Sequence, residues 1–298
     1  MKVYHEHTTG AQVHFRYYDF DKWIDKEDDF VFIDAPQVFT DIPDDFWKQK
    51  IVYLEQEEPN RFFSNVGWFN HYEFDDKFSE VFSICPYTTD WYNSMGKNHT
   101  NVFMPITYQP QQEDKLYDIC FAGHIYAGQI EEDVSVLKNF NYRVISNSEH
   151  KITTDKSVSQ EEKLQIISQS KISLVHNLLY PTEEHIANVK KISGWEKNAA
   201  FSRLDEGIVP QIKGRVFEAA MCKSLILCQR DPWNVIERFF EPEKEFVYYD
   251  KGCGKEKIEE ILANYENYLP VIEAAYEKSL NYTTKSFATK YLKAKETI

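Results

Sequence analysis

The sequence predicts an α/β protein in two parts, each built around a parallel sheet, and three of its features support this prediction. Short apolar runs rich in β-branched and aromatic residues recur along the chain, as expected of buried strands. Helical patterns lie between these runs, an alternation typical of parallel sheets rather than of β-sandwiches. The alternation occurs twice, before and after a polar stretch that contains Pro105 and Pro110. A stretch with two prolines is stiff and extended, so we expect a domain boundary near residue 110.

The elements of the first half are expected from their apolar runs, and those of the second half from clearer periodicity. In the first half we expect strands over residues 29–34, 50–54, 78–84 and 101–105, and helices over 15–23 and 42–49. In the second half we expect strands over 117–122, 142–145, 171–176, 224–228 and 246–249. The helices there cover 131–140, 159–168, 216–221, 255–280 and 285–295, with a cap at Ser157 or Ser159 and a break at Pro270.

The composition limits the classes of function. Of the 298 residues 42% are hydrophobic, which provides a packed core and excludes global disorder. The formal net charge of -14 lacks the basic footprint by which proteins bind nucleic acids, so nucleic-acid binding is not expected. The five cysteines are scattered, without a C-x-x-C pair, which favours a reducing compartment over a disulfide framework or a zinc site. No apolar run approaches the roughly 20 residues of a membrane span, and the N-terminus is too polar for a signal peptide, so we expect a cytoplasmic protein.

Residues 213–228 carry the most informative pattern, a cationic turn followed by a helix and a buried strand. Lys213 and Arg215 stand at the expected helix N-terminus, where unpaired N–H groups and the helix dipole attract anions. A nucleoside diphosphate fits this chemistry, because the two side chains add full positive charges. Glu218 lies about one turn further, and a carboxylate there suits the paired hydroxyls of a ribose. The alternative is an ordinary ion pair between Arg215 and Glu218 on a helix surface, worth only about 0.2–0.5 kcal/mol.

Residues 215–223, Arg-Val-Phe-Glu-Ala-Ala-Met-Cys-Lys, resemble a helix of GT-B glycosyltransferases that reads roughly Arg-x-Phe-Glu-Ala-x-x-Cys-Gly. The resemblance is to the compact group that includes spore-maturation-type enzymes and many viral homologues. It implies two Rossmann-like domains facing a central cleft, with a nucleotide-sugar bound mainly by the second domain. It also implies that Glu218 binds the donor ribose. Arg215 and Lys213 would then face the diphosphate and stabilise it as the leaving group.

Other segments extend this resemblance over much of the chain. Residues 117–124 resemble the opening strand and phosphate-side turn of the donor domain, which makes Gly123 and His124 donor-binding candidates. Residues 170–177 resemble a later strand of the same domain. Three departures leave the stereochemical outcome and the activity open. Lys223 replaces the usual Gly, and Pro210 stands where retaining families place the first glutamate of a Glu-x7-Glu motif. The usual Arg and Lys after the first donor-domain turn are missing, and His124 and Gln129 stand nearby instead.

Residues near the N-terminus complete the candidate site. Gly10 follows an expected first strand, and its loop either faces the cleft or is an ordinary turn. His14 is a candidate general base because histidine titrates near neutral pH, with a structural role as the alternative. Asp19 and Asp21 match the Asp-x-Asp of metal-dependent transferases, but no apolar strand precedes them, so no metal is expected.

A second group of carboxylates, Glu55, Glu57 and Glu58, precedes Pro59. One of them is a further candidate for the base that deprotonates an acceptor hydroxyl. The alternative is a solvated acidic turn.

We therefore expect three segments: an acceptor-side domain over residues 1–110, a nucleotide-sugar-binding domain over 111–282, and a helix within 283–298 that packs back toward the first domain. The expected activity is sugar transfer from a nucleoside-diphosphate sugar to a hydroxyl acceptor on a glycan, a lipid or a modified base. No cofactor is expected besides this donor substrate. A sugar-nucleotide epimerase of similar architecture and a non-catalytic nucleotide- or sugar-binding module remain alternatives.

Overall fold

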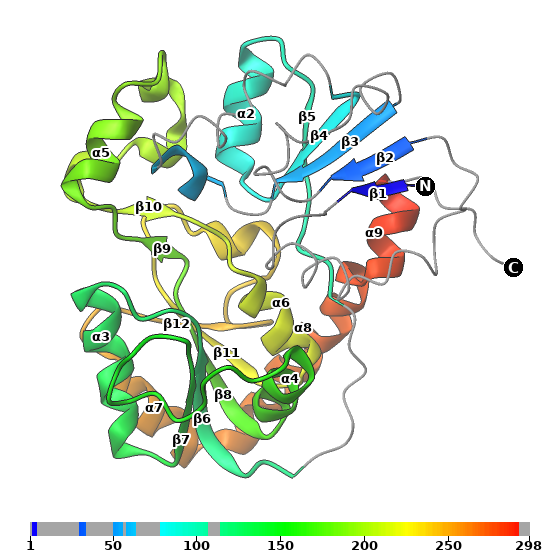
Figure 1. Ribbon diagram of the computed structural model, residues 1–298. Helices are drawn as coiled ribbons and strands as arrows, with labels where there is room; N and C mark the ends of the chain where they lie inside the picture. Colours follow the sequence, from blue (N-terminus) through cyan, green and yellow to red (C-terminus); the bar gives the residue numbers. More distant parts are fainter. Residues whose placement is uncertain are drawn as a thin grey trace, which may run out of the picture. The chain divides into compact units, whose positions relative to one another are not determined.

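The computed structural model describes residues 2–4, 30–33, 50–55, 58–63, 78–106 and 114–291 of the chain. By its internal contacts the chain forms two compact units. Unit 1 comprises Met1–Thr107, Leu178–Gln211 and Thr284–Ile298, and unit 2 comprises Tyr108–Asn177 and Ile212–Thr283. Each unit contains a five-stranded parallel sheet, which confirms the predicted α/β class (Figure 1).

The sheet of unit 1 has its strands in chain order, β1-β2-β3-β4-β5, and every neighbouring pair is parallel. The strands are β1 (Lys2–Tyr4), β2 (Phe30–Ile33), β3 (Lys50–Glu55), β4 (Glu80–Ser83) and β5 (His99–Asn101). The register places Val81 opposite His99 at the β4–β5 pair. The last strand was expected over 101–105, but the strand in this part of the chain is β5, which covers His99–Asn101. The helices expected over 15–23 and 42–49 lie outside the described residues.

A long excursion, Leu178–Gln211, belongs to unit 1 although we assigned its residues to the second domain. It contains β9 (Leu178–Leu179), α5 (Glu183–Val189), β10 (Val209–Pro210) and the 3₁₀ turns η9 (Trp195–Lys197), η10 (Ala199–Phe201) and η11 (Leu204–Glu206). Its buried side chains share one apolar cluster with α2 (Pro86–Ser94) and η4 (Asn60–Phe63). The amide of Asn188 also donates to the carbonyl of Phe63 over 2.9 Å. This shared core explains the grouping, because buried apolar area is the main stabilising term of a domain.

The helix α9 (Thr284–Tyr291) completes the core of unit 1. The ring of Phe287 is fully buried and meets Phe82 and Phe103 edge to face, with ring centroids 5.9 and 5.5 Å away. Aromatic pairs of this geometry add about 0.5–1.5 kcal/mol beyond the area they bury. Tyr291 of the same helix also packs on Phe82 and Phe103, with both ring centroids 5.7 Å away, so an aromatic cluster centred on Phe287 holds the C-terminal helix to unit 1.

Unit 2 is a doubly wound sheet in the order β12-β11-β8-β6-β7, with all neighbours parallel. The strands are β6 (Tyr117–Ala122), β7 (Tyr142–Ile145), β8 (Ser170–Val175), β11 (Leu225–Gln229) and β12 (Val247–Tyr249). The helices are α3 (Gly128–Ser135), α4 (Gln160–Ser168), α6 (Gly214–Met221), α7 (Gly254–Ala263) and α8 (Leu269–Ser279), with 3₁₀ turns η8 (Val136–Asn139), η12 (Val235–Arg238), η13 (Tyr265–Tyr268) and η14 (Leu280–Tyr282).

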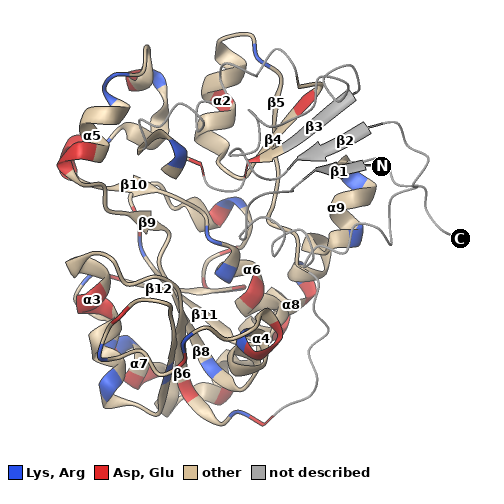
Figure 2. Ribbon diagram, viewed as in Figure 1, with Lys and Arg blue, Asp and Glu red and all other residues tan. Residues whose placement is uncertain are grey.

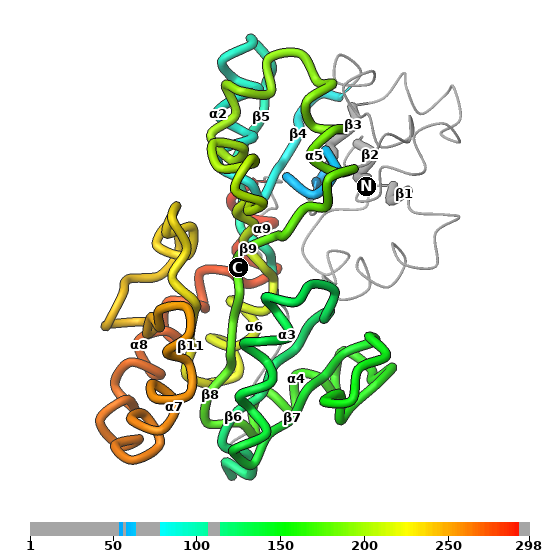
Figure 3. The backbone as a smooth tube through the Cα atoms, turned by 90° about the vertical axis from the view of Figure 1, so that its left-hand side faces the viewer, coloured from blue at the N-terminus to red at the C-terminus, as the bar shows by residue number. Residues whose placement is uncertain are grey.

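The helices of unit 2 cover both faces of its sheet. The helices α3 and α7 lie on one face, and α4, α6 and α8 pack together on the other (Figure 1). In Figure 3 the orange α7 and α8 mark the side of the β12 edge, and the green α4 marks the side of β7. Figure 2 shows that α3, α4 and α7 each carry charged residues.

The C-terminal helical region breaks earlier than the sequence indicated. We expected the break at Pro270, but α7 ends at Ala263 and Pro270 lies in the first turn of α8. Proline fits there because the first N–H groups of a helix have no partner within the helix. The cap of α4 is Ser159, one of the two predicted residues, and it forms a reciprocal capping box with Glu162.

The packing of α9 generates a stability prediction. We expect Phe287→Ala to lower the free energy of unfolding by about 3–5 kcal/mol, because it removes a fully buried ring and leaves a cavity. Urea unfolding measures this change. Thr289→Ala, at an exposed position of the same helix, should cost less than about 0.5 kcal/mol. Equal losses from the two variants would show that α9 is not anchored through its ring.

Candidate active site

The strand order of unit 2 locates a binding edge. In chain order within the unit the strands run 2-1-3-4-5, so the winding reverses between β6 and β8. Ligands of open α/β sheets bind outside the carboxyl ends of the strands at such a reversal. Gly123 follows the end of β6 and His176 follows the end of β8. Gln229 and Tyr249 are the last residues of β11 and β12, so all four lie at the carboxyl edge.

Arg215 and Gly123, both predicted site residues, lie against one another at this edge. Arg215 is the second residue of α6, and its guanidinium carbon lies 5.2 Å from the ring centroid of Phe121. A Cβ atom at position 123 would overlap the guanidinium, so any other residue there would force the guanidinium to move. Burial lowers the pKa of Arg215 to about 10, and the charge of Glu218 acts in the opposite direction. The guanidinium therefore remains charged at neutral pH, beside the N-terminus of α6.

Lys213, the second residue predicted to bind the diphosphate, is the N-cap of α6. It has an extended backbone, with φ -109° and ψ 140°, and its N–H donates to the amide oxygen of the buried Asn177 over 3.2 Å. A lysine side chain has no acceptor, so it cannot cap the helix as serine or aspartate would. The N-terminus of α6 thus has two cationic side chains, and its N-cap residue makes no side-chain capping hydrogen bond.

Glu218 lies one turn beyond Arg215 and is buried, with 7% of the residue exposed. Its Oε1 atom accepts from Lys163 Nζ over 2.6 Å and from Gln160 Nε2 over 2.9 Å. Burial alone would raise the pKa of Glu218, but the Lys163 ammonium, the two hydrogen bonds and the charge of Arg215 outweigh burial and lower it. The carboxylate is therefore ionised, and its ion pair is with Lys163 on α4 rather than with Arg215 on its own helix.

His176 joins the carboxyl ends of three strands. Its Nδ1 lies 3.0 Å from Gln229 Oε1, and its Nε2 lies 3.3 Å from the hydroxyl of Tyr249. Asp133 of α3 approaches Nδ1 at 3.6 Å. Burial, assisted by the charge of Arg215, lowers the pKa of His176 to about 4. The ring is therefore neutral near pH 7, and it acts as a fixed hydrogen-bonding group beneath the cationic site.

His124, the remaining predicted residue in unit 2, is exposed in the loop after β6. Its Nδ1 lies 3.2 Å from the hydroxyl of Ser148, which also accepts from the N–H of Ile125 over 2.8 Å. The ring of Tyr126 stacks on it at 6.2 Å between centroids. This loop begins at the carboxyl edge, where Gly123 bonds to the carbonyl of Ile145 over 2.9 Å.

The candidate residues of the N-terminal half fall into two groups, those outside the described residues and those buried in unit 1. Gly10 and His14, like Asp19 and Asp21, lie outside the described residues. Glu55 and Glu58 are fully buried in unit 1, so the solvated acidic turn considered for them is wrong. Glu55 accepts from Arg61 Nε over 3.1 Å, and Glu58 accepts from the Ser83 hydroxyl over 2.5 Å. Within the part of the chain that the structure describes, no three metal-binding side chains cluster, and no helix is long and apolar enough to cross a membrane.

Several residues of this site were not singled out from the sequence, namely His176, Gln229, Tyr249, Lys163 and Gln160. The first three share a signal that a strand prediction already contains, since each is the last residue of a buried strand or the one that follows it. The two residues of α4 have no such signal, because only the packing of α4 on α6 brings them to Glu218.

The comparisons with known proteins agree with this geometry. The model of the Glycosyl transferase-like family matches residues 129–293, more than half of the 298-residue chain. The chain belongs to this glycosyl transferase-like family. Among curated proteins no relative of this glycosyl transferase-like chain matches.

Solved structures show which fold the family member has. TarM, solved from S. aureus, superposes with a TM-score of 0.56 at 14% identity, covering 93% of this chain and 56% of TarM. HepE from Anabaena in complex with UDP gives 0.57 at 8% identity, covering 95% of this chain and 80% of HepE. The pneumococcal O-GlcNAc transferase GtfA, in complex with UDP and GlcNAc, gives 0.54 at 11% identity, covering 94% of this chain and 58% of GtfA. The glycosyl transferase-like chain thus has the GT-B fold and spans little more than half the length of TarM and GtfA. The cleft implied by the resemblance stays a prediction.

The depressed pKa of His176 predicts how acid affects stability. Between about pH 4 and 6.5 the unfolded chain binds a proton at this residue that the folded chain does not, so acid favours unfolding. This residue alone should remove about 2 kcal/mol of stability between pH 7 and pH 5. Urea unfolding of His176→Gln should show a correspondingly smaller loss than the wild type.

The titration of Asp133 changes the stability with pH in the direction opposite to that of His176. Burial raises its pKa to about 6, so its own contribution to stability grows as the pH falls. Both proteins contain Asp133, so its direct contribution cancels, and the difference between the two curves reports the loss of the imidazole together with its contact to Asp133. Parallel stability curves for wild type and His176→Gln over this range would contradict a neutral, buried imidazole.

Proposed function

We propose that this protein is a GT-B glycosyltransferase that transfers a sugar from a nucleoside-diphosphate sugar to a hydroxyl acceptor. The observation that carries the proposal is the charged guanidinium of Arg215 against Gly123, at the N-terminus of α6 and at the reversal of strand order. Anionic groups bind at helix N-termini, and bidentate contacts make arginine a strong partner for phosphate. Glu218, one turn along the same helix, supplies an ionised acceptor for ribose hydroxyls.

In this mechanism the residues of unit 2 act on the leaving group. Cleavage of the bond between the sugar and the diphosphate builds negative charge on the diphosphate. Arg215, Lys213 and the N-terminal N–H groups of α6 are fixed in place before the reaction and stabilise that charge. Glu218 holds the ribose and so sets where the sugar carbon lies. Gly123 and His124 border the same edge, and His14 stays the candidate base for the acceptor hydroxyl.

The structural neighbours narrow the choice of donor. HepE is solved with UDP and UDP-glucose, and GtfA with UDP and GlcNAc. Uridine diphosphate sugars are therefore the first donors to test. A glycan, a lipid or a modified base stays open as the acceptor.

We also propose that the chain belongs to the compact group that includes spore-maturation-type and viral enzymes, because residues 215–222 resemble the helix of that group. Its cysteines are free thiols, four of them buried, which fits a reducing, cytoplasmic location.

The central test removes the cation from the diphosphate site. Arg215→Met should weaken binding of UDP or another nucleoside diphosphate roughly 10- to 100-fold, because charge-assisted hydrogen bonds contribute about 1.5–3 kcal/mol. Isothermal titration calorimetry measures the affinity, and sugar release from the donor measures turnover. Lys223→Met, a cation removed at the opposite end of α6, should leave both unchanged.

The same assays separate the alternatives. Donor conversion that proceeds without any acceptor would identify an epimerase, and binding without turnover would identify a binding module. An Arg215→Met protein that binds nucleoside diphosphates as well as the wild type would refute the proposed site.

A further expectation concerns metals. If the cations of α6 stabilise the leaving diphosphate, a divalent metal is not required for transfer. Activity measured with an excess of EDTA should then equal activity without it. Loss of activity in EDTA that returns with added manganese or magnesium would overturn this expectation.

A further inference from the structure

The buried carboxylate of Glu218 is held by a second helix. Lys163 and Gln160, both on α4, donate to the same oxygen, Oε1, over 2.6 and 2.9 Å. The side chain of Glu218 is 9% exposed and that of Lys163 is 24% exposed, so the pair is shielded from water but open at one side. Both hydrogen bonds fall on one oxygen, which leaves Oε2 as the acceptor for a ligand.

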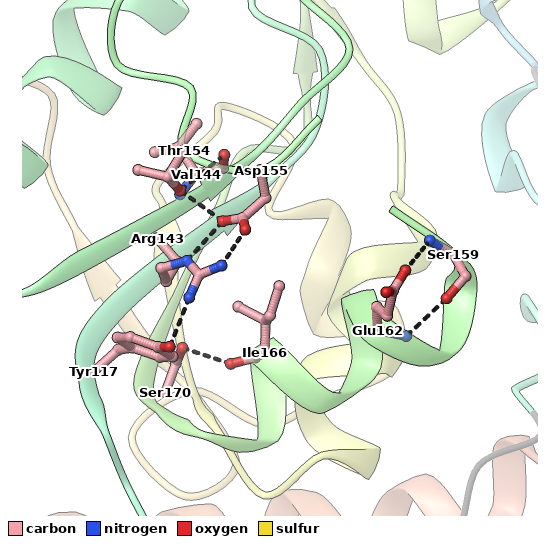
Figure 4. Close-up of polar contacts among 9 residues, drawn as sticks. All are labelled: Tyr117, Arg143, Val144, Thr154, Asp155, Ser159, Glu162, Ile166 and Ser170. Carbon is pink, nitrogen blue, oxygen red and sulfur yellow. Dashed lines mark hydrogen bonds and ion pairs between the residues drawn. The ribbon is translucent and has the colours of Figure 1, made fainter. Parts of the chain in front are cut away.

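Side-chain hydrogen bonds stabilise both ends of α4 (Figure 4). At its start the hydroxyl of Ser159 and the carboxylate of Glu162 form the capping box. At its end the Ser170 hydroxyl donates to the carbonyl of Ile166 over 2.8 Å.

The loop that leads into α4 is tied to the sheet by a second network in Figure 4. Arg143 of β7 forms an ion pair with Asp155 and donates to the hydroxyl of Tyr117 over 2.6 Å. Toward α6, the thiol of Cys222 donates to the carbonyl of Leu164 over 3.4 Å. The donors on α4 therefore reach Glu218 from a rigid support.

Taking this ion pair out of water costs free energy of desolvation, so its presence needs a reason other than stability. A buried ion pair usually gains little stability over apolar residues of the same size, so its presence alone is weak evidence for a stabilising role. A carboxylate that must accept hydrogen bonds from two neighbouring hydroxyls has to be ionised and correctly turned. A cation on one oxygen provides both conditions and orients the other oxygen.

We propose that Lys163, supported by Gln160, is a positioning residue that holds Glu218 ready to bind the ribose hydroxyls of the donor and so determines selectivity for ribonucleotides. This inference rests on the proposed function, because it assigns a task within the same site. Lys163 acts through Glu218 and does not touch the phosphates.

The experiment compares a ribonucleotide with its deoxy form. The probes are UDP and 2′-deoxy-UDP, or the corresponding ADP or GDP pair if the wild type prefers that base. Calorimetry on the full chain gives the ratio of the two dissociation constants. A hydrogen bond to an ionised carboxylate contributes enough that the wild type should prefer the ribonucleotide about tenfold.

Removing the support should remove the preference. In Lys163→Met the ratio should fall to about twofold, mainly through weaker ribonucleotide binding, and Lys163→Arg should restore it. Gln160→Leu, which keeps the cation, should reduce the ratio less. Lys171→Met is the matched control, because it removes a lysine of unit 2 at the start of β8, at the opposite edge of the sheet. Its ratio should equal that of the wild type.

The outcomes distinguish a failure of the proposed function from a failure of the positioning role of Lys163. A wild-type chain that binds no nucleoside diphosphate overturns the proposed function and this inference together. Equal weakening of both nucleotides in Lys163→Met, or an unchanged ratio, overturns the inference alone and leaves the diphosphate site in place. Circular dichroism checks that each variant is folded. If Lys163→Met does not fold, the comparison of Gln160→Leu with Lys163→Arg provides the test.

Discussion

The contact between Arg215 and Gly123 is the constraint on which the site depends. The guanidinium lies where a Cβ atom of residue 123 would be, so a side chain at this position would displace it. The neighbouring ring of Phe121 offers its π-face to the cation, which offsets part of the cost of taking the charge out of water. Burial lowers the pKa of Arg215 to about 10 and still leaves the residue charged. The result is a fixed positive charge at the carboxyl edge of a parallel sheet, where the winding of the fold already directs ligands.

The charge of Arg215 also influences the ionisation of two other groups of the site. His176, joined to Gln229 and Tyr249, lies near this charge, and its imidazole stays neutral because burial, assisted by the charge of Arg215, disfavours the protonated form. The pKa of Glu218 is lowered, because Lys163 and Arg215 both favour its ionised form and outweigh the opposing effect of burial. One helix thus presents a cation and an anion one turn apart, a spacing suited to a ligand that has a diphosphate at one end and a ribose at the other.

Much of the donor-side unit was predictable because its signals are local. The strand over 142–145 and the helix capped by Ser159 occur where the sequence indicated, since apolar periodicity and a capping box act within a few residues. The motif around Arg215 and Glu218 is equally local. The contacts of the excursion Leu178–Gln211 were not predictable, because two-residue strands and 3₁₀ turns have no periodicity to read, and its core partners lie about a hundred residues away. The partners of Glu218 and His176 depend on which elements neighbour one another, and one sequence does not display that.

The most direct measurement is a crystal structure of the chain with a bound nucleoside diphosphate. The account predicts phosphate oxygens within about 3 Å of the Arg215 guanidinium and ribose hydroxyls at a similar distance from Glu218 Oε2. A nucleotide bound elsewhere, with Arg215 still against Gly123 and away from every phosphate, would contradict it.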